Sequence, residues 1–257
     1  MVVSYNADDG VGFITLDKPP ANSYDKAFME ELGEAIVAAA SDDAAKVVVL
    51  RSSSPKFFSA GADVKAFAEQ DVDESMEMID VAHRALGRIA AIPKVFIALI
   101  QGHALGGGLE MTLACDLRFA ARGSYKLGTP EVTLGLLPGN GGTQRLPRLV
   151  GASRALDLMI TGRRVSPGEA HALGILDRLL PVARAEELTL DYARELAGGA
   201  AEAIGAIKRA VHSGVQLPLD DGLARERELI AELFRSRDAR EGLTAFLEKR
   251  EPAFGRA

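Results

Sequence analysis

The sequence predicts an α/β core with a mostly parallel sheet, followed by a region made only of helices. Two observations lead to this prediction. Apolar runs typical of buried strands alternate with stretches of helical periodicity along the first part of the chain. After about residue 181 the strand signals stop, and four helical patterns follow one another. We therefore predict an α/β core over residues 1–197 and a helical C-terminal region over residues 198–257.

Several short segments of the core have the apolar character of strands. They are Val11–Leu16, Lys46–Arg51, Val95–Ile100, Asp116–Ala120 and Asp177–Pro181. Between them, apolar residues recur with the period of a helix. The predicted core helices are Asp25–Ala40, Met76–Ile92, Leu109–Ala114 and Ala152–Gly162, and a polar loop is expected at Ser52–Asp63. Because helices connect successive strands, we expect most strands to run parallel.

The C-terminal region consists of four segments with helical periodicity. They are Ala185–Ala197, Glu202–Ser213, Leu219–Ser236 and Ala239–Arg250. In the last segment Leu243, Phe246 and Leu247 recur at helical spacing and form an apolar stripe. Such a stripe on a terminal helix is expected to pack against the core or against another subunit.

The composition excludes several classes of protein. The chain has 257 residues, of which 47% are hydrophobic, so it can bury a sizeable core. A formal net charge of -6 argues against a broad basic face for nucleic acid. No stretch approaches the roughly 18–20 apolar residues of a membrane span. The four histidines are scattered without the spacing of zinc ligands, so no metal site is expected.

Cysteine content and the N-terminus indicate a cytoplasmic protein. Cys115 is the only cysteine, which rules out an internal disulfide and fits a reducing compartment. It lies in an apolar segment, so we expect a buried and inert thiol. The N-terminal residues lack the basic and apolar pattern of a signal peptide.

A glycine triplet, Gly106–Gly108, lies between a predicted strand and a predicted helix. Glycines at this place let backbone N–H groups approach a ligand at the N-terminus of the helix. Glu110 follows Gly107 by one helical turn, so its carboxylate is expected near the same N–H groups. Backbone donors beside a carboxylate are suited to stabilising an oxyanion and moving a proton.

Two more segments are expected to complete this site. They are Ser59–Asp63, after a strand, and Leu127–Glu131, a tight turn that ends in a second acid. Together the three segments would place two carboxylates and two N–H donors around a polarised carbonyl group. Each segment also has a purely structural explanation. Glycines build turns, Glu110 is favourable with the helix dipole, and Glu131 follows a proline at a turn.

Several motifs resemble those of the crotonase superfamily, and of the enoyl-CoA hydratases in particular. They are FFSAGADVKAF, QGHALGGGLEMTLACDLRFA, LGTPEVTLGLLPGNGGTQRLPRLVG, TGRRVSPGEAHALGILDRLLP and EGLTAFLEKREPAF. The resemblance covers almost the whole chain and keeps the order of the motifs. It implies a spiral of ββα units with a helical C-terminal subdomain, assembled as a homotrimer or homohexamer.

The resemblance also implies roles for individual residues. The backbone N–H groups of Ala62 and Gly107 would form the oxyanion hole, and Glu110 and Glu131 would be the catalytic acids. Residues expected to contact the CoA part of the substrate are Lys56, Ala60, Lys65, Phe246 and Lys249, the last two often across a subunit boundary. CoA would be part of the substrate, and neither a metal nor a separate cofactor is expected.

The activity implied is the addition of water to a 2-enoyl-CoA thioester, which gives a 3-hydroxyacyl-CoA. Two alternatives stay open: a double-bond isomerase on the same scaffold, and a noncatalytic relative that binds acyl-CoA or RNA. One departure from the family pattern is Ser23-Tyr24, where Ala-Leu is common. We expect it to affect an early loop near the CoA-binding region more than the acids.

Overall fold

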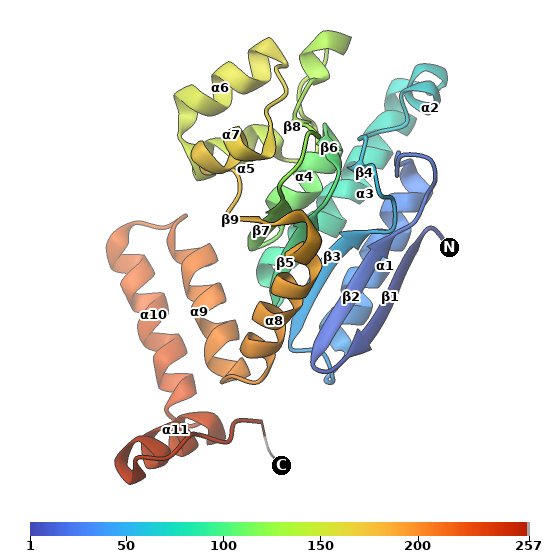
Figure 1. Cartoon of the computed structure of the whole chain (residues 1–257). Coiled ribbons are helices and arrows are strands. Elements are labelled where there is room, and N and C mark those ends of the chain that lie inside the picture. Colours follow the sequence, from blue (N-terminus) through green and yellow to red (C-terminus); the bar gives the residue numbers. More distant parts are fainter. Residues whose placement is uncertain (256–257) are drawn as a thin grey trace.

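The core contains two sheets, and the computed structural model describes residues 1–255 (Figure 1). The larger sheet has six strands in the order β1-β2-β3-β5-β7-β9, of which only the β1–β2 pair is antiparallel. The smaller sheet has three parallel strands in the order β4-β6-β8. The strands are β1 Val3–Asp8, β2 Val11–Leu16, β3 Val47–Ser52, β4 Phe57–Ser59, β5 Val95–Ile100, β6 His103–Leu105, β7 Leu117–Ala121, β8 Leu127–Gly128 and β9 Arg178–Leu180.

Consecutive strands alternate between the two sheets before the chain enters a helix. Strands β3, β5 and β7 lie in the larger sheet, and the strands that follow them, β4, β6 and β8, lie in the smaller one. The α-helices are α1 Lys26–Ser41, α2 Val64–Glu69, α3 Val72–Ala91, α4 Gly107–Ala114, α5 Gly142–Val150, α6 Ala152–Thr161, α7 Pro167–Ala172, α8 Ala185–Ala197, α9 Ala201–Gly214, α10 Leu219–Leu233 and α11 Arg237–Glu248. This repetition confirms the expected ββα units.

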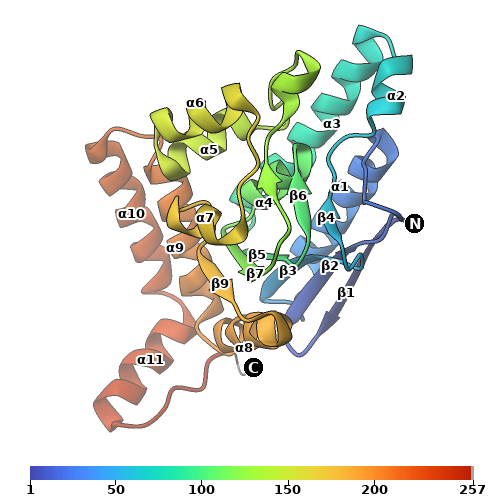
Figure 2. The same cartoon turned by 45° about the horizontal axis from the view of Figure 1, so that its top comes forward.

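Helices cover both faces of the larger sheet around β5, and side chains along this strand alternate between the two faces. All six residues of β5 are buried. Phe96 and Ile100 belong to the cluster packed by α1, α3 and α4, whereas Val95 and Ile97 belong to the cluster packed by α8. Figure 2 shows α8 on one side of the sheet and α1, α3 and α4 on the other. The continuous apolar run of β5 is therefore the signature of a strand buried on both faces.

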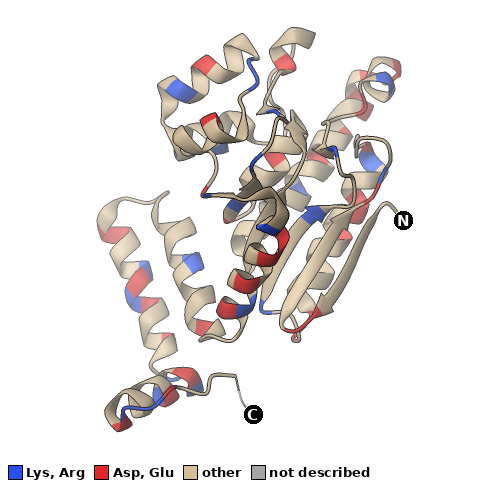
Figure 3. Cartoon of the chain, viewed as in Figure 1, with Lys and Arg blue, Asp and Glu red and all other residues tan. Residues whose placement is uncertain are grey.

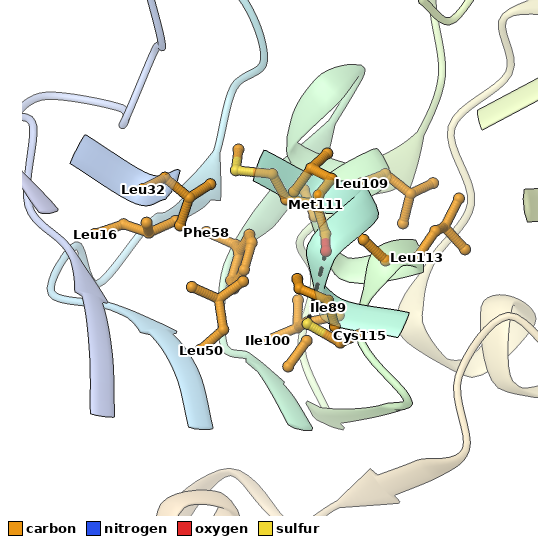
Figure 4. Packing of buried hydrophobic residues seen from close by; sticks show 14 of the residues in the cluster. Leu16, Leu32, Leu50, Phe58, Ile89, Ile100, Leu109, Met111, Leu113 and Cys115 are labelled. Atoms are coloured by element: carbon orange, nitrogen blue, oxygen red, sulfur yellow. Dashed lines mark hydrogen bonds between the residues drawn. The ribbon is translucent and has the colours of Figure 1, made fainter. Parts of the chain in front are cut away.

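Helix α4 lies inside the first of these clusters (Figure 4). All eight of its residues are buried, so it has apolar neighbours all round rather than along one stripe. Cys115, at its C-terminal end, is buried and its sulfur lies 3.7 Å from the carbonyl oxygen of Met111. The expectation of a packed thiol is confirmed. The same burial fixes α4 rigidly, which matters because the helix carries Glu110.

The structure corrects several predicted boundaries. Helix α3 begins four residues earlier than the expected start at Met76, because Asp71 and Glu74 form a reciprocal capping box. Strand β1 was not predicted, since most of its residues face solvent and carry no apolar run. The expected loop at Ser52–Asp63 contains β4, and β6 and β8 were also missed. Two or three residues are too few to show a period.

From α8 to residue 255 the structure contains helices only, as predicted. Helix α9 packs against α3, β5 and α8, α10 packs along α9, and α11 extends away from the core (Figure 1). The boundary between residues 1–197 and 198–257 stays a prediction. Acidic and basic residues are mixed along α8, α10 and α11 (Figure 3). None of the helices among residues 1–255 is both long and apolar enough to cross a membrane.

Candidate active site

Glu110 is a buried carboxylate held by two backbone amides. Its residue is 1% exposed, and it lies in the first turn of α4. Its Oε1 atom accepts hydrogen bonds from the N–H groups of Asn140, at 2.8 Å, and Gly142, at 2.6 Å. Glycine is required at position 142, because a Cβ there would lie 2.9 Å from the same Oε1 atom. Asn140 and the first residue of α5 therefore fix one oxygen of Glu110, and the other oxygen has no hydrogen-bond partner among residues 1–255.

Burial dominates the electrostatics of Glu110. Desolvation raises its pKa to about 7, and the charge of Glu131 acts in the same direction. The hydrogen bonds from Gly142 and Asn140 and the positive charge of Arg145 oppose this shift. A carboxylate whose pKa lies near neutrality can both accept and release a proton, which is the requirement for general acid–base catalysis.

Glu131 begins the short 3₁₀-helix Glu131–Leu134 and reaches back toward the glycine triplet. A Cβ at Gly106, where φ is +55°, would lie 2.9 Å from the Oε1 atom of Glu131. The Oε2 atom is buried and has no hydrogen-bond partner among the described residues. Burial raises the pKa of this carboxyl group. A half-buried acid with a buried, unpartnered oxygen is suited to hydrogen-bond a ligand.

The two predicted oxyanion donors lie on segments that approach each other closely. Gly61 has a φ of +96°, and a Cβ there would lie 2.8 Å from the carbonyl oxygen of Leu105 and 3.6 Å from the nitrogen of Gly107. Gly61 thus brings the N–H of Ala62 to the N-terminus of α4. Neither Ala62 nor Gly107 donates its N–H to an acceptor among residues 1–255. Both donors are therefore available to a ligand.

Tyr24 is a residue of this site that the sequence did not place there. It is 3% exposed, and the side chain of Asn140 donates a hydrogen bond to its hydroxyl oxygen at 2.6 Å. A Cβ at Gly107 would overlap this hydroxyl group. Burial and the charges of Glu110 and Glu131 raise the pKa of Tyr24. The expectation that Ser23-Tyr24 affects the early loop more than the acids is therefore wrong.

Residues proposed to contact CoA divide into two groups. Lys56 and Lys65 are exposed, and Ala60 is half-buried, on the segments that flank β4. Burial lowers the pKa of His103, and the charges of Lys56, Arg164 and Lys126 act in the same direction, so these three basic groups lie near His103. The sequence did not indicate Arg164 and Lys126. Lys56, Lys126 and Arg164 lie far apart along the chain, so no local sequence pattern indicates the basic cluster that they form. Its positive charge is suited to phosphate groups.

Phe246 and Lys249 lie in a different part of the molecule from Lys56, Ala60 and Lys65. Phe246 is 81% exposed on α11, and Lys249 caps the same helix in a left-handed conformation. Figure 1 shows α11 at the opposite end of the molecule from α2, which carries Lys65. A single chain does not bring these two residues to the acids. No group of three or more potential metal ligands is found among the described residues.

Comparisons with known proteins show the family of this chain. The family model described as enoyl-CoA hydratase/isomerase matches residues 6–257. A probable enoyl-CoA hydratase of Bacillus subtilis is 37% identical over 98% of this chain and 98% of its own. An enoyl-CoA isomerase/hydratase of Mycosarcoma maydis is 35% identical over 95% of this chain and 92% of its own.

A solved enoyl-CoA hydratase structure from Geobacillus kaustophilus superposes with a TM-score of 0.97, at 46% identity, and the match covers 99% of this chain and 96% of that one. The chain belongs to the enoyl-CoA hydratase/isomerase family. The resemblance to the crotonase superfamily and its fold is thereby confirmed.

Proposed function

We propose that this chain hydrates 2-enoyl-CoA thioesters to 3-hydroxyacyl-CoA thioesters. The observation that carries the proposal is the pair of carboxylates, the buried Glu110 and the half-buried Glu131, beside two backbone N–H groups that have no acceptor among residues 1–255. Burial raises the pKa of both acids. Hydration needs one group to accept a proton from water and another to deliver a proton to carbon, so a pair sharing one proton is suited to it.

The roles of the residues follow from their places in the site. The N–H groups of Ala62 and Gly107 donate hydrogen bonds to the thioester oxygen, which draws electron density from C3. Glu110 accepts a proton from water as the water oxygen bonds to C3. The electron pair of the C2–C3 double bond then takes a proton at C2 from Glu131. The proton gained by Glu110 must return to Glu131 before the next turnover.

Binding of the CoA part completes the proposal. Lys56, Ala60 and Lys65 would contact the nucleotide, beside the basic groups near His103. Phe246 and Lys249 would reach the substrate of a neighbouring subunit in a homotrimer or homohexamer. Three large apolar side chains of α11, among them Phe246, are 60–81% exposed in one chain, which supports such an assembly. Neither a metal nor a separate cofactor takes part in these steps, and we propose a cytoplasmic location.

A second candidate is a double-bond isomerase, since one relative is named an isomerase/hydratase. An isomerase shuttles one proton and needs a single base, whereas here Glu110 follows the glycine triplet on α4 and Glu131 reaches back to Gly106. A noncatalytic relative that binds acyl-CoA or RNA is a third candidate, and the net charge of -6 argues against RNA.

One assay separates the three candidates. The purified protein is mixed with crotonyl-CoA, and loss of the enoyl thioester absorbance is followed. A parallel reaction with a 3-enoyl-CoA detects isomerisation. We expect hydration to be the faster reaction, and to be lost in Glu110→Gln. Isomerisation without hydration would support the second candidate, and no turnover of either substrate would support the third.

A further inference from the structure

Tyr24 is tied to the oxyanion segment through its backbone. Its N–H donates to the carbonyl oxygen of Gly61 at 3.0 Å, and its own carbonyl oxygen accepts the N–H of Asp63 at 2.8 Å. Its ring packs against Phe28, with 6.4 Å between the ring centroids. The position of the Tyr24 hydroxyl group is thus fixed relative to Ala62, which lies between these two backbone bonds.

From this fixed position, a short series of hydrogen bonds leads to Glu110. The Nδ2 atom of Asn140 donates to the Tyr24 hydroxyl oxygen at 2.6 Å. The backbone N–H of Asn140 donates to Oε1 of Glu110 at 2.8 Å, and that of Gly142 donates to the same atom at 2.6 Å. The side chain of Asn140 therefore binds Tyr24, whereas its backbone N–H binds Glu110. One residue links the tyrosine to the catalytic carboxylate.

The same loop has two other side-chain contacts. Arg145 donates to the carbonyl oxygen of Asn140 at 2.8 Å, and a ring nitrogen of His83 lies 2.6 Å from the carbonyl oxygen of Gly139. Both contacts are made to backbone carbonyl oxygens and not to the side chain of Asn140. Tyr24 alone binds the side chain of Asn140 among the described residues, since the Oδ1 atom of Asn140 is buried and unpartnered.

Packing alone does not account for the hydroxyl group of Tyr24. Phenylalanine would supply the same ring against Phe28, and a buried hydroxyl costs free energy unless it is hydrogen-bonded. Here the hydroxyl binds the loop that supplies both amides of Glu110. We propose that Tyr24 is a positioning residue, which acts through Asn140 to keep the amides of Asn140 and Gly142 on Glu110. This inference rests on the proposed hydration.

The electrostatic consequence has a definite sign. The two amides stabilise the ionised carboxylate of Glu110 and so oppose the rise of its pKa. Glu131 and Arg145 also face this carboxylate, and neither is changed when Tyr24 is altered. If the loop loosens, the amides bind less well, and the pKa of Glu110 rises further. Glu110 then loses its charge at a higher pH than in the parent protein.

The test compares Tyr24→Phe with the parent protein. We expect kcat for crotonyl-CoA hydration to fall about 10-fold with KM nearly unchanged, since the carboxylate is misplaced but the CoA contacts remain. The low-pH limb of kcat/KM should move upward from about 7. Asn140→Ala should have the same effect, and the double variant should be no slower than the slower single one.

Tyr5→Phe is the matched control. Tyr5 also uses its hydroxyl group, in a 2.7 Å hydrogen bond with Asp42, but it lies on β1 away from the acids. Its kcat and pH profile should equal those of the parent protein. Unchanged kcat and pH profile in Tyr24→Phe would overturn the inference. So would fully multiplicative effects of Tyr24→Phe and Asn140→Ala, because then the tyrosine does not act through the asparagine.

A second readout does not depend on turnover. Carbon-13 labelling of glutamate lets NMR follow the carboxyl titration of Glu110, which the spectrum of Glu110→Gln identifies. We expect this titration to move to higher pH in Tyr24→Phe, and an unchanged titration would contradict the inference. A parent protein that fails to hydrate crotonyl-CoA would contradict the proposed function instead, while the NMR comparison still decides the role of Tyr24.

Discussion

The Nζ atom of Lys208 lies 2.8 Å from Oδ2 of Asp116, and this ion pair fastens α9 to the core. The lysine side chain is 4% exposed and the aspartate side chain 11% exposed. Lys208 also donates to the carbonyl oxygens of Ile89 and Lys94, each at 2.7 Å. A charged group so deeply buried is tolerated only with a complete set of partners.

Replacing Lys208 should therefore destabilise the fold without affecting catalysis. Lys208→Met leaves the charge of Asp116 and two buried carbonyl oxygens without the ammonium group. We expect the free energy of unfolding to fall by about 3 kcal/mol or more, measured by urea titration at fixed protein concentration. Lys26→Met removes an exposed ion pair with Glu77 and should leave stability unchanged. Equal stabilities of the two variants would show that the buried pair is dispensable.

The two acids should each be needed for turnover. We expect Glu110→Gln and Glu131→Gln to bind acyl-CoA but to lower kcat by about 100-fold or more, the scale of a lost general acid or base. The kinetics are followed with crotonyl-CoA, and circular dichroism confirms that the variants fold. Near-normal turnover in either variant would remove that residue from the proposed mechanism.

The pH profile of the parent protein should be bell-shaped. The active form carries one proton on the pair formed by Glu110 and Glu131. Below a pH of about 7 a second proton binds, because burial raises the pKa of Glu110 to that value, and kcat/KM falls. At high pH the shared proton is lost, and the rate falls again. The assignment would be contradicted if kcat/KM stayed constant through pH 7 and fell only in the range where an ordinary carboxyl group titrates.

Glu110 should also make the fold less stable as the pH rises. Its folded-state pKa of about 7 lies above its ordinary value of 4.5, so the folded state binds the proton more tightly. The stability this confers is present at low pH and is lost as the pH rises through 7. Between about pH 5 and pH 8, Glu110→Gln should gain roughly 2.5 kcal/mol relative to the parent protein. Parallel curves of unfolding free energy against pH would contradict the raised pKa.

Gly107 should tolerate no side chain while Tyr24 is present. A Cβ at Gly107 would overlap the tyrosine hydroxyl group, so Gly107→Ala should cost about 1–3 kcal/mol of stability through overpacking. The cost should be smaller in a Tyr24→Leu background, where the double-mutant cycle measures the coupling. Gly87 meets nothing within 4 Å and provides the control. Gly87→Ala should be neutral or stabilising, because it lies inside α3.

The exposed side chains of α11 should control assembly. We expect Phe246→Ser to shift the protein toward smaller species in sedimentation at micromolar concentration. Lys249→Ala should keep the assembly but raise KM, because Lys249 would contact a phosphate group of CoA. A monomeric parent protein with full hydration activity would contradict both the assembly and the shared site.

Sequence periodicity predicted the long elements well and the short ones poorly. Val95–Ile100 is apolar throughout, and the structure places a strand over the same residues. Strand β8 has only two residues, Leu127 and Gly128, so it has no pattern to detect. Its place in the smaller sheet depends on pairing with β6, a contact between distant parts of the chain. Tertiary pairing of this kind leaves no local signal.

The sequence could predict those parts of the site whose residues lie close together along the chain. Gly107 and Glu110 are close in sequence, so the helix itself brings them together. Tyr24 and Asn140 are 116 residues apart, and neither residue type alone indicates a site. The departure from the family pattern at Tyr24 was visible, but its position beside the acids depends on the fold. The three-dimensional structure is needed to find such a residue.

The amides that hold Glu110 have a consequence for biosynthesis. They belong to residues 30 and 32 positions later in the chain. During translation α4 therefore leaves the ribosome before the residues that stabilise its carboxylate. Until Gly142 has emerged, Glu110 can be buried only in its protonated form, because burial of the unpaired anion is unfavourable. The hydrogen bonds that stabilise the ionised form of Glu110 therefore form only after Gly142 has been synthesised.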